Sequence, residues 1–98
     1  IMNPYQYYSP AAENLPKEMI EGMIQFLNRK QKIVLKNRLR GIESNDEIEL
    51  KAILRFLDSI GLHACYNMVG YRGTYHFPTY DDCEMWEDWI WQCRDKED

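Results

Sequence analysis

Apolar residues recur every three or four positions through the first half of the chain, which is the spacing of one face of an α-helix. The first such stretch covers residues 15–28. Its apolar positions are Met19, Ile20, Met23, Ile24 and Leu27. Pro16 suits a first helical turn, because the N–H that proline lacks has no intrahelical partner there. We therefore predict a first helix over residues 15–28.

A second helix is predicted over residues 29–40. Its apolar stripe consists of Val34, Leu35, Leu39 and Ile42. Gly41 is placed to end it in a left-handed cap. The β-branched residues within 33–35 make a strand the competing interpretation. We favour the helix, because the stripe extends over more than four residues.

The third predicted helix has the clearest boundaries. Ser44 and Glu47 have the spacing of a capping box at its start, and Gly61 is placed to end it. Its wide apolar face consists of Leu50, Ile53, Phe56, Leu57 and Ile60. We expect this helix to be the central element of the core.

The pattern changes beyond residue 62, where aromatic and β-branched residues favour strands. Gly70 and Gly73 mark a turn between two short runs. We therefore predict a β-hairpin that pairs residues 62–68 with residues 71–77.

A last helix is predicted to start at Thr79, which has capping-box spacing with Asp82. One apolar stripe along it consists of Met85, Trp86, Trp89, Ile90 and Cys93. Trp91 lies on a different face from this stripe. We expect the stripe to anchor the helix to the core and Trp91 to be left for another role.

Together these elements predict an α+β fold with three N-terminal helices, a short β-hairpin and a C-terminal helix. A chain of 98 residues suffices for one core without metal or disulfide bonds. We expect a single domain over residues 14–98, preceded by an extended arm over residues 1–13. Three tyrosines in the arm can pack on the domain or on a partner: Tyr5, Tyr7 and Tyr8.

The charges of the chain are sorted along its length, although its net charge is only -4. Six of the twelve basic residues fall in one short segment. They are Arg29, Lys30, Lys32, Lys36, Arg38 and Arg40. Such a segment is a candidate for binding nucleic-acid phosphates, while the negative net charge disfavours unselective binding.

The C-terminal segment is acidic and aromatic. The last eighteen residues hold eight of the sixteen acidic residues and all three tryptophans. Tryptophan and tyrosine are enriched at the centres of protein interfaces. Our candidate partner-binding residues are therefore Trp91 with its flanking carboxylates and the N-terminal tyrosines: Trp91, Glu84, Glu87, Asp88, Tyr5, Tyr7 and Tyr8.

Candidate reactive groups do not form a recognisable site in the sequence. His63, Cys65 and His76 are legitimate zinc ligands, but their spacing matches no standard zinc module. No triad or acid–base pair can be assembled either. We expect neither an enzyme nor a bound metal or cofactor.

The odd number of cysteines and the absence of a CxxC pair or a secretory leader indicate a cytoplasmic protein without a membrane segment. The sequence therefore predicts a small acidic regulator or inhibitor, of the kind that phage and mobile elements encode. It would bind another protein that has a basic surface. The alternative is a small nucleic-acid-binding regulator that uses residues 29–40.

Overall fold

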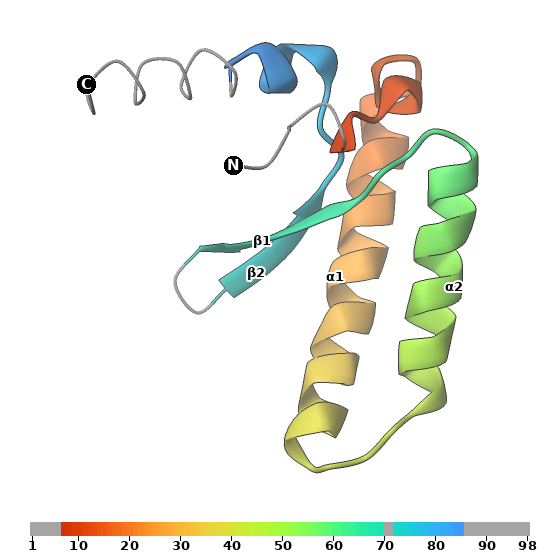
Figure 1. Cartoon of the computed structure of the whole chain (residues 1–98), viewed down its shortest axis with the longest axis vertical. Coiled ribbons are helices and arrows are strands. Elements are labelled where there is room, and N and C mark those ends of the chain that lie inside the picture. Colours follow the sequence, from red (N-terminus) through yellow and green to blue (C-terminus); the bar gives the residue numbers. More distant parts are fainter. Residues whose placement is uncertain (1–6, 70–71, 86–98) are drawn as a thin grey trace, which may run out of the picture.

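The computed structural model of the chain describes residues 7–69 and 72–85. Two long helices lie side by side, and a two-stranded antiparallel sheet packs against them (Figure 1). The elements are the 3₁₀ helix η2 (Pro10–Glu13), the helices α1 (Lys17–Leu39) and α2 (Asn45–Ser59), and the strands β1 (Cys65–Val69) and β2 (Arg72–His76). Residues 80–85 are also helical. The α+β class is confirmed.

The first two predicted helices are one continuous helix, α1, of 23 residues. Neither glycine nor proline separates residues 15–28 from residues 29–40, so nothing in the backbone interrupts the helix. Lys36 and Arg38 in the last turn suit the negative end of the helix dipole. The strand interpretation of residues 33–35 is wrong. The prediction of three N-terminal helices is also wrong, because the described residues form two long helices after the short η2.

Both predicted glycine stops are confirmed. Gly41 and Gly61 have positive φ angles of 69° and 85°. The residue after each glycine returns a backbone hydrogen bond to the last helical turn, from Ile42 N to Asn37 O and from Leu62 N to Leu57 O, both at 2.9 Å.

Of the two predicted capping boxes, the one at Ser44 is not formed and the one at Thr79 is. Ser44 is the N-cap of α2, but its hydroxyl makes no capping bond and is buried without a partner among the described residues. Glu47 binds Arg38 of α1 instead of returning to the N-cap. The second box is formed, with Thr79 N donating to Asp82 Oδ2 at 2.9 Å and Asp82 N to Thr79 Oγ1 at 3.4 Å.

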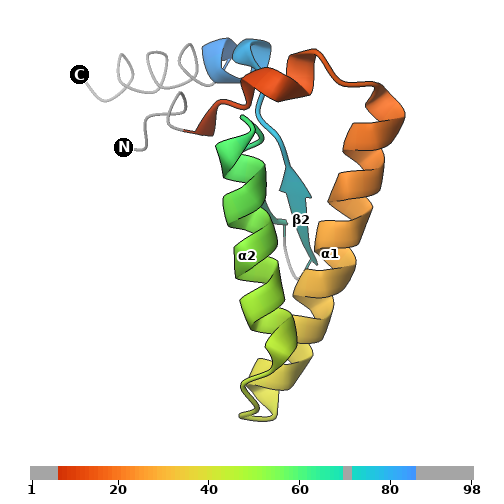
Figure 2. The same cartoon turned by 90° about the vertical axis from the view of Figure 1, so that its right-hand side faces the viewer.

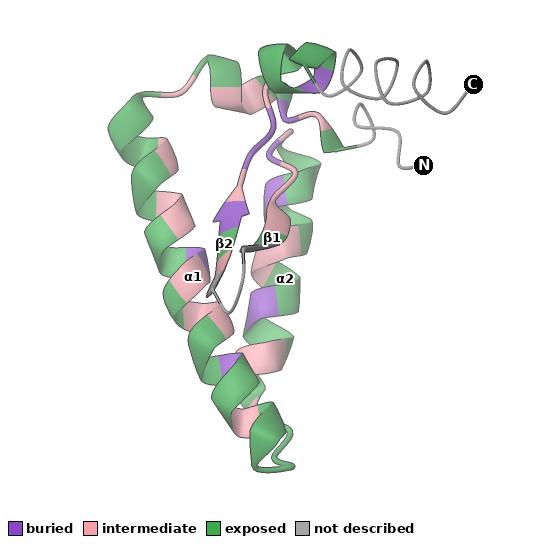
Figure 3. Ribbon diagram, turned by 90° about the vertical axis from the view of Figure 1, so that its left-hand side faces the viewer, coloured by how far each residue is buried: buried purple, intermediate pink, exposed green. Residues whose placement is uncertain are grey.

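The hairpin is confirmed, with strands shorter than predicted. Its register pairs Cys65 with His76 and Val69 with Arg72. It lies across one side of the helix pair (Figure 3). Tyr75 of β2 is buried in the core that also contains Leu27, Val34, Leu50, Leu57, Leu62 and Phe77.

The N-terminal segment joins the domain from Ser9 onward. Ser9 is fully buried, and its N–H donates to Pro78 O at 2.8 Å. Its hydroxyl donates to His63 O at 2.8 Å and accepts from His63 N at 2.9 Å. Pro10–Glu13 then form η2 rather than an extended chain.

Several positions of the predicted apolar stripes are exposed rather than buried. They are Met19, Leu35, Leu39, Ile42, Phe56, Ile60 and Met85. The reason is geometric, because each helix is covered only where the other helix, η2 or the hairpin lies against it. At the helical segment 80–85, Cys83 is the buried residue.

Candidate functional site

An apolar groove runs between α1 and α2 on the side of the helix pair away from the hairpin. Leu27 and Leu57 form its floor, and Met19, Met23, Phe26 and Ile53 form its walls. Gly22 completes the lining, and the volume is about 320 Å³. Figure 2 views the molecule from the side where the two helices lie in front of β2.

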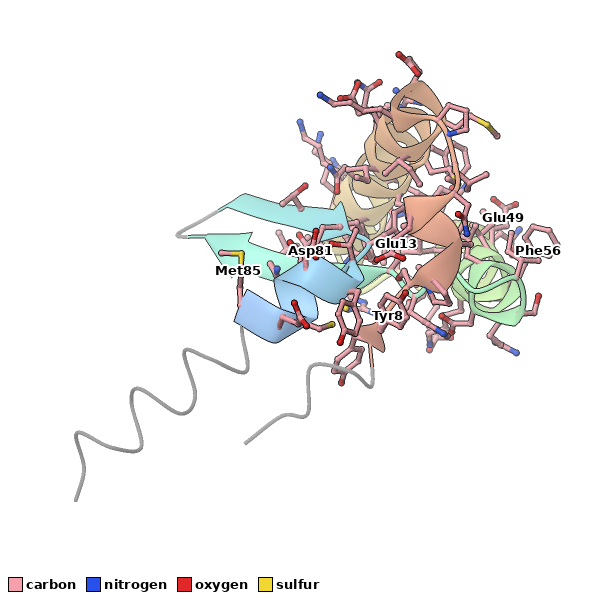
Figure 4. All side chains as sticks on the ribbon, turned by 90° about the horizontal axis from the view of Figure 1, so that it is seen from above. Tyr8, Glu13, Glu49, Phe56, Asp81 and Met85 are labelled. Atoms are coloured by element: carbon pink, nitrogen blue, oxygen red, sulfur yellow. The ribbon has the colours of Figure 1, made fainter. Side chains whose placement is uncertain are left out.

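Helical spacing explains why these side chains meet. Met19, Met23 and Phe26 lie four and three residues apart, which places them on one side of α1. Ile53 and Leu57 have the same relation on α2. Phe56 follows on the outer edge of α2 and is 62% exposed. It projects away from the hairpin and from Met85 (Figure 4).

A charged cluster lies one helical turn beyond the residues that line the groove. Lys30 follows Phe26 by one turn of α1, and its Nζ contacts Asp46 Oδ1 at 2.9 Å and Glu49 Oε2 at 2.5 Å. These two hydrogen bonds, first that to Glu49, raise the pKa of Lys30. The cluster itself therefore holds two carboxylates and one ammonium.

The structure divides the six basic residues of the predicted nucleic-acid-binding segment into two groups. Lys30 and Arg38 bind carboxylates of α2, and Arg38 lowers the pKa of Glu47 through its hydrogen bonds. The other four are exposed and form no ion pair within the described part of the chain. They are Arg29, Lys32, Lys36 and Arg40.

The candidate partner-binding residues are only partly described. Glu84 is exposed on the helical segment 80–85, and Tyr7 is exposed near the N-terminus. Trp91, Glu87, Asp88 and Tyr5 lie outside the described residues. The candidate surface as a whole therefore stays a prediction.

Tyr8 makes its contacts within the domain. Its ring meets that of Tyr80 edge to face at 6.1 Å, and its hydroxyl donates to Glu13 Oε2 at 3.1 Å. Desolvation, together with the bond to Glu13, raises the pKa of Tyr8. Glu13 Oε1 also accepts from Tyr80 N at 3.0 Å, so it helps to cap the helical segment that follows (Figure 4).

Two histidines lie beside polar side chains, but neither arrangement forms a reactive site among the described residues. Asp58 Oδ1 lies 3.0 Å from His63 Nδ1, but the nearby Ser9 hydroxyl bonds to the backbone of His63 and not to its ring. On the hairpin, His76 Nδ1 lies 3.0 Å from Asn67 Nδ2. Within residues 7–69 and 72–85, no three His, Cys, Asp or Glu side chains are placed to hold a metal ion.

No protein-family model, curated protein or solved structure matches this chain. Among the described helices, none is sufficiently long and apolar to cross a membrane.

The apolar pattern does not predict the groove, because it places Met19 and Met23 on one face of the first helix and Ile53 on the face expected to form the core. One signal was available in the sequence. Gly22 lies beside the first apolar stripe, in a stretch that otherwise favours a helix, and interior glycines weaken helices.

Proposed function

We propose that this protein is a non-catalytic regulator that binds an α-helix of another protein in the groove between α1 and α2. The observation that carries the proposal is an apolar groove that the described residues leave uncovered. In helix-in-groove recognition, an amphipathic helix lays its apolar face into a hydrophobic groove of this kind. The bound helix would complete a three-helix layer.

The charges around the groove favour a partner helix with basic residues beside its apolar stripe. Asp46 and Glu49 lie one turn beyond the groove lining, and their two carboxylates share the single ammonium of Lys30. The net charge of -4 adds a long-range attraction for a basic partner. Phe26 and Phe56 have exposed aromatic rings that the apolar stripe of the partner helix would cover.

The test compares two charge substitutions on the same helix. Phe56→Glu places a carboxylate beside the groove, and Ile48→Glu places one on a side of α2 away from it. The two side chains are similarly exposed, at 62% and 67%. Proteins captured from native extract are purified, and their binding to wild-type and variant proteins is measured by titration calorimetry.

We expect Phe56→Glu to weaken binding by at least about 2 kcal/mol, the scale of an interface hot spot. Ile48→Glu should leave affinity within about twofold of wild type, as expected for surface positions outside an interface. Circular dichroism melts must show both variants folded. Equal affinities for Phe56→Glu and Ile48→Glu would contradict the proposal.

The alternative function, binding of nucleic acid, is favoured by the exposed cations of α1. Arg29, Lys32, Lys36 and Arg40 are spaced by three, four and four residues and so share one side of the helix end. Four phosphate contacts would give a log–log salt slope of about -3.6 on duplex DNA.

Reversal of Lys32, Lys36 and Arg40 to Glu tests this alternative, and reversal of Lys17, Lys51 and Arg55 is the control of equal charge. Loss of DNA binding in the first variant alone would support the alternative. We expect only weak binding that both variants abolish equally, because their net charges are the same.

A further inference from the structure

Gly22 is an interior residue of α1, where glycine is unfavourable. It costs conformational entropy that alanine does not, and it contributes no side chain to packing. The two described glycines with positive φ are Gly41 and Gly61. Gly22 has ordinary helical geometry, so the backbone conformation gives no reason for a glycine at this position.

Internal packing gives no reason either. A Cβ atom added to Gly22 would meet no heavy atom within 4 Å apart from its chain neighbours and the backbone of its own helix turn. Gly73 of β2 is the opposite case, because a Cβ atom there would collide with the Tyr66 ring. The fold therefore explains Gly73 and leaves Gly22 unexplained.

The position of Gly22 supplies the missing reason. It lies in the lining of the groove, with Met19 and Phe26 one turn away on either side. The absent side chain leaves a notch between these larger residues. Methionine side chains, with three rotatable bonds, adapt readily to the shape of an inserted group.

We propose that Gly22 is a specificity-determining notch that receives one large apolar side chain, Phe, Leu or Met, from the docked helix. This inference rests on the proposed function and adds the identity of the recognised residues. The eight residues from Gly22 to Lys30 correspond to about 12 Å along α1. A helix in the groove therefore presents a Lys or Arg to Glu49 about seven or eight residues from the inserted side chain.

The probe is a displayed library of helical peptides of about 18 residues, five turns of helix. Its apolar stripe and flanking positions are randomised, and it is selected against the full chain. Enriched peptides are synthesised, and their binding is measured by fluorescence anisotropy. The proteins compared are wild type, Gly22→Ala, Gly22→Gln, Phe56→Glu and Ile48→Glu.

We expect the enriched peptides to carry a large apolar residue and a basic residue at the stated spacing. Gly22→Gln fills the notch and should weaken their binding about ten- to hundredfold, the scale for one buried side chain. Gly22→Ala should weaken it less. Both variants should melt at a higher temperature than wild type, because each replaces an interior glycine by a better helix former.

The outcomes separate the two proposals. Peptides that lose binding to Phe56→Glu but bind Gly22→Gln like wild type overturn the notch and leave the groove intact. Peptides that bind Phe56→Glu and Ile48→Glu equally overturn the groove itself. A lower melting temperature of Gly22→Ala shows that the glycine serves the fold and also overturns the notch. Enriched peptides with Asp or Glu at the basic position overturn the role of Glu49.

Discussion

The two sides of the helix pair are built differently. On the hairpin side, polar residues of α1 hold β2 in place. Asn28 donates to Thr74 Oγ1 at 3.0 Å and accepts from Tyr75 N at 2.8 Å, while the Tyr75 hydroxyl donates to Gln31 at 2.6 Å. On the groove side, α1 and α2 present Met19, Phe26 and Phe56 at the surface.

On one side of α1, hydrogen bonds hold a strand in place, whereas the other side presents apolar side chains without such bonds. Hydrogen bonds to a strand fix its register and position, since an unpaired buried donor would be costly. The groove side lacks such directed bonds among its lining residues, and its flexible methionines suit a partner that binds and leaves. The hairpin side should therefore govern stability, and the groove side should govern binding.

The largest expected contrast is between two adjacent residues of α2. Leu57 is buried in the floor between the helices, and Leu57→Ala should cost about 2–5 kcal/mol of unfolding free energy. Phe56→Ala should change stability by only about 0.5 kcal/mol, because that ring is mostly exposed. Urea titrations of both variants measure the contrast. Equal losses would show that Phe56 belongs to the core.

The next contrast is between two polar residues of α1 that differ in their contacts and exposure. Asn28→Ala removes the bonds to Thr74 and Tyr75 N and should cost about 1–3 kcal/mol, since the Tyr75 N–H loses its partner. Gln25→Ala, at an exposed position, should stay within about 0.5 kcal/mol. Amide hydrogen exchange at Tyr75 should also accelerate in Asn28→Ala. Unchanged exchange there would contradict the anchoring role of Asn28.

Substitution of two glycines by alanine should change the unfolding free energy by smaller amounts and in opposite directions. Gly22→Ala should raise the unfolding free energy by about 0.5–1 kcal/mol, because alanine favours the helix and its Cβ meets no packed neighbour. Gly73→Ala should lower it, because the Tyr66 ring must move. Thermal melts of the two variants measure the signs. A destabilised Gly22→Ala protein would refute the view of the groove as open space.

The smallest expected effect is a pH dependence of the melting temperature that comes from the ion pair between Arg38 and Glu47. Arg38 holds the pKa of Glu47 below its ordinary value of 4.5. A lowered folded pKa stabilises the fold above the ordinary value and loses this contribution as pH falls through the folded value. The melting temperatures of wild type and Arg38→Gln should therefore differ at pH 7 and converge below the pKa of Glu47. A gap that stays constant down to that pH would exclude this pair as its cause.

Local rules in the sequence determined much of the fold. The glycine stops at Gly41 and Gly61 follow from the freedom of glycine to adopt positive φ, which needs no knowledge of the rest of the chain. The hairpin and the capping box at Thr79 are also local, because their partners lie within a few residues. Hydrophobic periodicity likewise located the helical stretches, although it divided α1 in two.

Only the tertiary structure decided which side of each helix is covered. Periodicity places Leu57 and Phe56 on one broad face, but the position of α1 buries the first and exposes the second. The same packing turned Lys30 and Arg38 toward α2 and left Arg29 and Lys32 at the surface. The groove has the same origin. A sequence pattern indicates which side chains favour burial. A groove forms where no segment distant in the sequence packs over such side chains, and only the tertiary structure decides that.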